Sequence, residues 1–159
     1  MAKSNPLKNI DNLSTGLAGI TTYQSGVAQA TAFRIVKKHT ATALKEYGLS
    51  CMQWFTIGTV LDAGNKGIRL SDLAQKLDTT LAYMTTTVNF FFSREILERH
   101  AHGTDARTKL IKVRNSYKKE CAIIEADVRK KLATLLYGQI DSEELLAYIM
   151  VLYKISQLK

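Results

Sequence analysis

The side chains best suited to chemistry lie close together in one short part of the chain. His100, His102 and Asp105 fall within the stretch HAHGTD. Alternate residues of an extended strand share a face, so the two histidines could approach a metal ion together. Asp105, however, falls in the Gly-Thr-Asp turn rather than on that face. We therefore predict no metal site and no cofactor here.

The two cysteines offer a second kind of chemistry. Cys51 follows Ser50, an expected helix cap, and a helix N-terminus lowers the pKa of a thiol, as a redox sensor requires. The alternative, which we favour, is that Cys51 and Cys121 are small buried residues. The sequence has no nucleophile elbow, phosphate-binding loop or zinc signature, and its three histidines lack a partnered nucleophile. We predict that the protein is not an enzyme.

Charge points to an acidic partner. The 159 residues carry a formal net charge of +8, with a pI near 9.5 and an ordinary globular composition. Eight Lys or Arg but only three acidic residues lie between Arg94 and Lys119, whereas Thr79–Phe92 has no charge at all. The chain has no secretion signal at its start and no apolar run of bilayer length. We expect a cytoplasmic protein that binds DNA and no membrane.

The hydrophobic repeat predicts a mostly helical chain. A long helix is expected over 23–47, with Gly48 ending it. Ser50 and Gln53 form a capping box for the second helix, and Thr80 can cap the uncharged one. The further helices are expected to start at Ser71, Ser116 and Asp141.

Two extended runs interrupt the helices. Ile96–His100 and Lys109–Arg114 flank the turn and predict a β-hairpin. Three short helices followed by a hairpin are the layout of a winged helix-turn-helix. The expected fold is mainly α with a small β-hairpin wing (α+β). Its expected parts are an N-terminal arm (1–20), a helical dimerisation region (21–48 and 116–159) and a winged helix-turn-helix DNA-binding region (49–115).

The ordered segments LSCMQW, LSDLAQKL, TTLAYMTTTV and REILERHAHGTDARTKLIKV resemble the multiple antibiotic resistance regulator (MarR) family. The resemblance covers about 49–117 without a gap. Asp105-Ala106-Arg107 stands where the family has its Asp-x-Arg near the hairpin tip. The resemblance implies that Arg107 contacts the minor groove or the DNA backbone and that Asp105 orients it.

Three positions depart from the family pattern. Thr85-Thr86 stands where the recognition helix often has Thr-Arg, and Glu95 stands where Gly usually follows that helix. Val113-Arg114 replaces Leu-Thr before the fifth helix, so we expect Asn115 or Ser116 to cap it. Without an arginine, bidentate reading of guanine is lost from the recognition helix. We therefore expect recognition that favours A·T pairs or depends on DNA shape.

Helical spacing divides the uncharged helix into two faces. Met84, Val88 and Phe91 should pack on Leu73 and Leu77, leaving the opposite face to DNA. The hairpin should grip phosphates. The expected DNA-binding residues are Thr80, Ala82, Tyr83, Thr85, Thr86, Asn89, Phe90, Arg99, Asp105, Arg107 and Lys109.

The residues and the resemblance together predict a transcriptional regulator. It would bind double-stranded DNA sequence-specifically, as a homodimer on a near-palindromic operator, and act as a repressor. The resemblance also implies a small aromatic effector, for which Tyr23, Phe33 and Trp54 are the candidate pocket residues. Two alternatives stay open: a winged-helix protein-interaction module that uses an exposed Phe90, and a sequence-tolerant DNA-coating protein.

Overall fold

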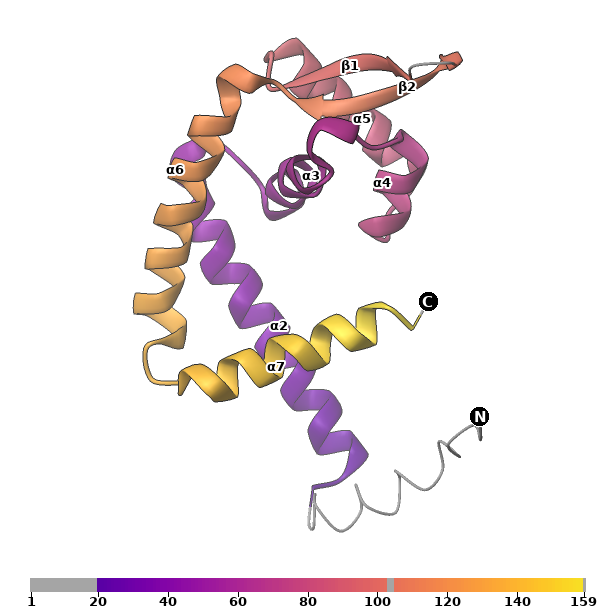
Figure 1. Ribbon diagram of the computed structural model, residues 1–159. Helices are drawn as coiled ribbons and strands as arrows, with labels where there is room; N and C mark the ends of the chain where they lie inside the picture. The colour runs from indigo at the N-terminus through magenta and orange to yellow at the C-terminus, as the bar shows by residue number, and fades with distance from the viewer. Residues whose placement is uncertain (1–19, 103–104, 159) are drawn as a thin grey trace. The chain divides into compact units, whose positions relative to one another are not determined.

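The computed structural model describes residues 20–102 and 105–158, and the side chains of residues 20–100 and 109–158 (Figure 1). The chain divides into two compact units within helix α2 (Thr22–Leu44), between Val36 and Lys37. The first unit holds the start of α2. There Thr21 and Gln24 exchange bonds, because the Thr21 N–H donates to Gln24 Oε1 and the Gln24 N–H donates to Thr21 Oγ1.

The end of α2 confirms the predicted long helix. A 3₁₀ turn, η1 (Lys45–Tyr47), continues it, and Gly48 then takes a left-handed φ of +63°. The Tyr47 hydroxyl donates to Asp127 Oδ2 at 2.8 Å, and Lys131 Nζ lies 2.7 Å from the same carboxylate oxygen. The bond to Asp127 raises the pKa of Tyr47. This cluster ties η1 to helix α6 (Asn115–Leu132).

Helices α3 (Cys51–Asp62), α4 (Leu70–Lys76) and α5 (Leu81–Ser93) form the helix-turn-helix part of the second unit (Figure 1). The predicted capping box is present at α3: the Gln53 N–H donates to Ser50 Oγ, and the Ser50 N–H donates to Gln53 Oε1. Helix α4 begins at Leu70, one residue before the predicted start. Arg69, at its N-cap position, makes no side-chain cap bond.

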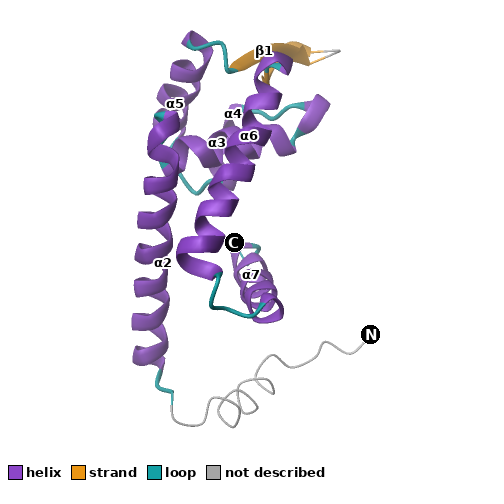
Figure 2. Cartoon of the chain, turned by 90° about the vertical axis from the view of Figure 1, so that its left-hand side faces the viewer, coloured by secondary structure: helices purple, strands orange, loops and turns teal. Residues whose placement is uncertain are grey.

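Strands β1 (Leu97–His102) and β2 (Asp105–Val113) form an antiparallel hairpin that is longer than predicted (Figure 2). A bridge between Ile68 and Ile111 joins the start of α4 to β2. Gly67 precedes that bridge with a φ of +70°. A Cβ there would lie 2.9 Å from the Ile111 carbonyl oxygen, so the close approach requires glycine.

The hairpin and helices α3–α6 share one hydrophobic core. Its large, fully buried side chains come from these elements and from the end of α2: Leu44, Ile57, Leu73, Met84, Phe91, Leu97 and Ile124. Met84 and Phe91 are both on α5, as the helical spacing predicts, and Leu77 packs against the cluster. The core therefore fixes α5 on α4 with one face left outward.

A single residue, Arg114, separates the end of β2 from the start of helix α6. The expectation that Asn115 or Ser116 caps this helix is wrong, because Arg114 occupies the N-cap position and makes no side-chain cap bond. A short π-helix, η3 (Ala133–Tyr137), continues α6 and leads to helix α7 (Ser142–Ser156), which Asp141 caps. None of the helices in the described ranges 20–102 and 105–158 is long and apolar enough to span a bilayer.

Candidate nucleic-acid interface

Helix α5 presents a neutral surface because none of its residues is charged and the residue that caps it, Thr80, has a hydroxyl side chain. Thr80 caps it as predicted, since the Tyr83 N–H donates to Thr80 Oγ1 at 3.2 Å. Met84, Val88 and Phe91 are buried, and Thr87 is buried beside them. The exposed residues are Leu81, Ala82, Tyr83, Thr85, Thr86, Asn89 and Ser93.

The threonines of α5 bond to their own helix. Thr85 Oγ1 donates to the Leu81 carbonyl at 2.8 Å, and Thr86 Oγ1 donates to the Ala82 carbonyl at 3.2 Å. Bonds of this kind use the hydroxyl proton and leave an acceptor oxygen and a methyl group. Thr85 and Thr86 can therefore offer acceptors and methyl groups to a partner, but their donors are engaged.

Phe90 is not the exposed residue that the helical spacing suggested. It is half-buried, and its ring meets the ring of Phe91 edge-on, with centroids 5.4 Å apart. The Arg94 guanidinium lies 4.3 Å from the Phe90 ring centroid and covers it further. Phe90 is at the edge of the core rather than at the centre of the exposed face.

The hairpin brings Arg99 onto α5. Leu97 is paired with Val113, and Arg99 is paired with Ile111, two residues away along each strand. Both pairs therefore lie on the hairpin face that holds the buried residues. Arg99 Nη2 donates to Asn89 Oδ1 at 3.0 Å, and its Cζ lies 4.3 Å from the centroid of the Phe92 ring. Sequence reasoning selected Asn89 and Arg99 separately and missed this pair. The signal in the sequence was the spacing of Asn89 and Phe92, which lie about one helical turn apart and can both contact one side chain.

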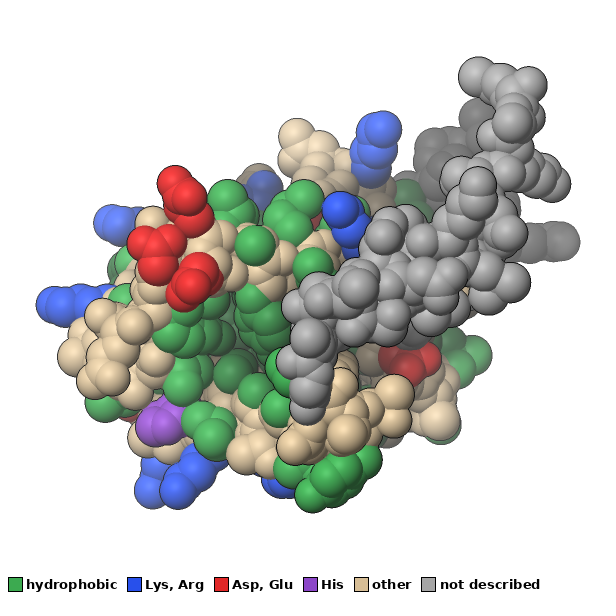
Figure 3. Space-filling model, turned by 90° about the horizontal axis from the view of Figure 1, so that it is seen from below, with side chains coloured by type: hydrophobic (Ala, Val, Ile, Leu, Met, Phe, Trp, Pro, Cys, Tyr) green, Lys and Arg blue, Asp and Glu red, His purple; other side chains and the backbone are tan. Residues whose placement is uncertain are grey.

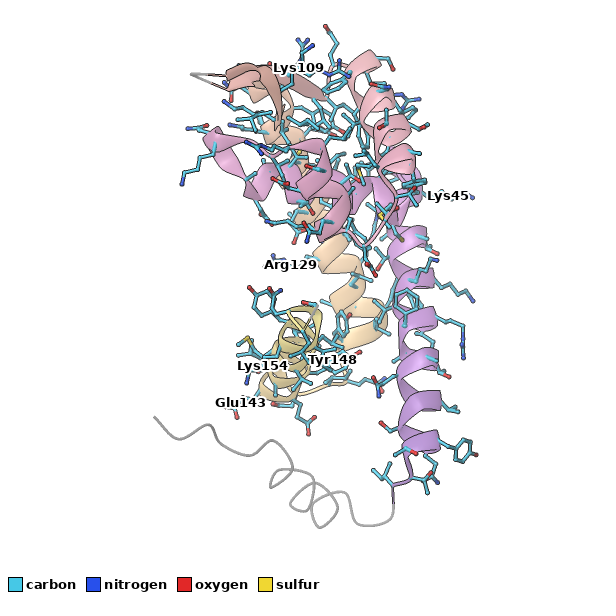
Figure 4. The ribbon with its side chains drawn as sticks, turned by 90° about the vertical axis from the view of Figure 1, so that its right-hand side faces the viewer. Lys45, Lys109, Arg129, Glu143, Tyr148 and Lys154 are labelled. Carbon is cyan, nitrogen blue, oxygen red and sulfur yellow. The ribbon has the colours of Figure 1, made fainter. Side chains whose placement is uncertain are left out.

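A hollow of about 180 Å³ lies between α5 and the hairpin. Its polar side chains are Thr85, Asn89, Arg99 and Lys109, all of which were predicted to bind DNA. Leu70, Val88, Phe92 and Ile111 complete the lining. Lys109 projects from β2 near the top of the hairpin (Figure 4). Two cations thus lie beside a helix that has none of its own.

Asp105 and Arg107 lie on β2, in the part of the hairpin whose side chains are outside the described residues. The side chains of His102 and Asp105, which were considered as metal ligands and rejected, are outside the described residues as well. His100 Nε2 lies 2.9 Å from Glu98 Oε1. Among the described side chains, no three potential ligands are grouped around a common point.

Glu95, between α5 and the hairpin, has a φ of +58°. This is the left-handed conformation for which glycine is suited, at the position where the family pattern has glycine. Arg114 Nη1 lies 3.5 Å from Glu95 Oε1 and joins this turn to the base of the hairpin. The departure from the pattern leaves the turn intact and replaces glycine with an ion pair.

The three candidate effector residues belong to two different units of the chain. Trp54 lines an open cavity of about 650 Å³ between α3 and α6, together with Phe55, Ile57, Gly58, Thr59, Leu61, Asp62, Leu77, Lys118, Cys121, Ala122 and Glu125. Tyr23 and Phe33 belong to the first unit, where both are exposed. Sequence reasoning missed Lys118, Cys121 and Glu125 as lining residues; their spacing of three and four was the signal.

Neither cysteine has the surroundings of a redox sensor. Cys51 is buried, and its Sγ lies 3.6 Å from the Lys37 carbonyl oxygen, an acceptor for the thiol proton. Burial raises the pKa of Cys121 to about 11, which disfavours the reactive thiolate.

The sequence matches no protein-family model and no curated protein. Solved structures do match its fold. A MarR-family transcriptional regulator from Rhodococcus sp. RHA1 has a TM-score of 0.77 at 14% identity, over 89% of this chain and 100% of its own. CouR from Rhodococcus jostii RHA1, solved with p-coumaroyl-CoA, has a TM-score of 0.74 at 15% identity, over 89% and 98%.

A third solved structure contains DNA. The MepR–DNA complex of S. aureus has a TM-score of 0.65 at 19% identity, over 86% of this chain and 96% of the MepR chain. At these identities the likeness concerns the fold. The chain has the winged-helix fold of MarR-family regulators, which confirms the predicted fold class and the resemblance at that level.

Proposed function

We propose that this chain is a transcriptional regulator of the MarR type, which binds double-stranded DNA sequence-specifically as a homodimer and represses transcription. The observation that carries the proposal is the pairing of a neutral, outward-facing helix α5 with a hairpin that sets Arg99 and Lys109 beside it. A winged helix binds DNA in this arrangement, with the helix in the major groove and basic side chains on phosphates. The solved MepR–DNA complex has the same fold.

The division of labour follows from the side chains. Thr86, Asn89 and Ser93 are small enough to allow α5 to approach base edges, and none of them holds charge. The hairpin and its flanks supply the electrostatic attraction, with Arg107 reaching the minor groove or the backbone as the family resemblance implies. A neutral reading helix is compatible with DNA binding because the cations are on neighbouring elements.

The homodimer is supported by the exposed apolar side chains of helix α7. Helix α7 has no buried residue, and Leu146, Tyr153 and Ile155 are 62%, 63% and 52% exposed. Hydrophobic side chains are gathered on the face shown in Figure 3. Monomeric proteins rarely expose apolar patches of this extent. Two copies would present two α5 helices to successive major grooves, about 34 Å apart, on a near-palindromic operator.

An effector is supported by the cavity beside Trp54. Its wall is mainly aromatic and aliphatic, and its charged side chains are Lys118, Asp62 and Glu125. A small aromatic effector fits this wall, and CouR was solved with p-coumaroyl-CoA. Binding would favour one arrangement of the two α5 helices over another and so change the affinity for the operator.

The test is fluorescence-anisotropy binding to the DNA upstream of the protein's own gene and to a scrambled duplex, across a salt series. Binding several hundredfold tighter to the native DNA, with a moderate salt slope, supports a specific regulator. Replacing Arg107 by Ala should weaken binding to both duplexes and reduce the salt slope.

Two results would contradict the proposal. Equal affinity for both duplexes, with a steep salt slope, indicates a DNA-coating protein. Absence of binding at low salt indicates a protein-interaction module. The structure weighs against such a module, because Phe90, the residue expected to contact a protein partner, is half-buried under Arg94.

A further inference from the structure

The uncharged helix α5 has an arginine on its surface, and that arginine comes from the hairpin. The guanidinium of Arg99 is fixed in two ways, by the bond to Asn89 Oδ1 at 3.0 Å and by the Phe92 ring below it at 4.3 Å. A guanidinium stacked on a ring and bonded at one edge keeps its plane and its direction. Arg99 is therefore held against α5 instead of moving freely over the hairpin.

We propose that Arg99 is the base-reading arginine of this protein, that Asn89 positions it, and that the pair selects guanine in each half-site. The inference rests on the proposed function, since it assumes that α5 meets DNA. It reverses the expectation of a preference for A·T pairs, which followed from the absence of arginine within α5.

The argument is a count of donors and acceptors. A guanidinium has five N–H donors and no acceptor, and one nitrogen of Arg99 is engaged with Asn89. The Asn89 carboxamide accepts that bond with its oxygen, so its NH₂ group is the part left to meet a base. Both side chains then present donors. Guanine has two adjacent acceptors, O6 and N7, at the major-groove edge, which is the arrangement that a donor pair fits.

Asn89 would otherwise be a reader of adenine. Bidentate pairing with adenine requires the carboxamide oxygen to accept from N6 while the NH₂ group donates to N7. In this structure one of the two lone pairs of the oxygen already accepts from Arg99, so adenine N6 would have to share the oxygen with the guanidinium. The Thr85 and Thr86 hydroxyl protons are held within the helix, so those residues add no competing donor.

Arg99 has no carboxylate partner among the described side chains, in contrast to Arg114 and Arg129. Its side chain is exposed, and among the described side chains no carboxylate lies within ion-pair distance of it. Arg114 is paired with Glu95, and Arg129 is paired with Glu125. Lys109 lines the same hollow and attracts phosphates, but its ammonium group cannot form the planar bidentate bond that a guanidinium forms.

The experiment is selection of bound duplexes from a library with a randomised central region, followed by anisotropy titration of the best duplex and of a scrambled one. The wild-type protein, R99A, R99K and N89A are compared. The matched control is K112A, because this substitution removes the same charge from the opposite face of the hairpin, where Lys112 is the cross-strand neighbour of Glu98.

The expected wild-type motif contains one guanine per half-site. R99A should lower affinity for that duplex by about 10- to 100-fold while lowering affinity for scrambled DNA only slightly. R99K should retain affinity for scrambled DNA and lose the guanine preference, because an ammonium cannot form the fork. N89A should lose the same preference, and N89A combined with R99A should be no worse than R99A. K112A should weaken binding to both duplexes equally.

Four results would overturn the inference. They are a wild-type motif made only of A·T pairs, an R99A variant that keeps the guanine preference, an R99A effect equal on both duplexes as for K112A, and an N89A variant that changes a different base position. In each of these cases the wild-type protein binds DNA and the proposed function stands. If the wild-type protein binds no duplex, the proposed function and this inference fail together.

Discussion

The winged-helix part of the second unit buries its apolar side chains, whereas helix α7 leaves its apolar side chains exposed. Helix α5 buries Met84 and Phe91 completely in a core shared with the hairpin. Helix α7 carries a comparable share of apolar side chains and buries none of them. One region is complete within a single chain, whereas the other has the composition of a core but lacks the second layer. Stability and assembly should therefore respond to different residues.

The largest effect is expected in the core. Replacing Phe91 by Ala should lower the free energy of unfolding by about 3–5 kcal/mol, because a ring with no exposed surface leaves a cavity. Urea unfolding at one fixed protein concentration measures it. Phe90→Ala is the matched control, and because Phe90 is half-buried its cost should be clearly smaller. Equal costs for the two rings would contradict the burial pattern.

Assembly should be sensitive to α7. Replacing Ile155 by Glu should raise the dimer dissociation constant by roughly a hundredfold, since an interface would have to bury a carboxylate. Sedimentation velocity over a concentration series measures this constant. Ser156→Glu introduces the same charge at the adjacent polar residue and should have a much smaller effect. A wild-type protein that sediments as a monomer at all concentrations would contradict the dimer.

Alkaline pH should act on the core rather than on α7. Burial raises the pKa of Cys121 from 9.0 to about 11, so the folded state keeps the thiol proton to a higher pH than the unfolded state. The stabilisation is complete below pH 9.0 and is lost as the pH rises through about 11.

Urea unfolding between these pH values should show the decline, and Cys121→Ala should show a shallower one. The part that remains comes from Tyr47, Tyr117 and Tyr137, whose pKa values are also raised. A decline that is identical in the variant would show that Cys121 does not cause it.

The smallest effect concerns the turn between α5 and the hairpin. Glu95→Gly should raise the free energy of unfolding by up to about 1 kcal/mol, because glycine adopts the left-handed φ of +58° without a Cβ penalty. The loss of the exposed Arg114 ion pair offsets part of this gain. Glu95→Ala removes the ion pair but keeps the backbone cost, so it should be slightly destabilising. Glycine no better than alanine would contradict the strain.

The features that were predictable from sequence depend on residues close along the chain. The capping box of Ser50 and Gln53, the Thr80 cap and the Gly48 stop involve partners within a few positions. The hairpin was predicted from two extended runs around a Gly-Thr-Asp turn, although its strands extend further than expected. Local hydrogen bonding and turn chemistry determine all of these.

The failures depend on neighbours that are distant in sequence or not periodic. Helical spacing places Phe90 off the core face, but the Phe91 edge and Arg94 cover it. The hydrogen bond from Arg99 to Asn89 depends on the register of the hairpin, which cannot be predicted from the helical pattern of the sequence. Trp54 lines a cavity together with Lys118, Cys121 and Glu125 of α6, which a search for aromatic types alone does not reach. The role of Trp54 in binding an effector stays a prediction.

Helix α6 joins the hairpin base to α7, and its length gives it mechanical leverage. Its 18 residues rise about 27 Å, and a single residue separates its start from the end of β2. A tilt of about 5° at the end nearest α7 would displace the other end by about 2 Å. That displacement is comparable to the shift that takes a base contact out of hydrogen-bonding range. Under the proposed function, a small angular change on the α7 side would thus be amplified into a change of register at the DNA.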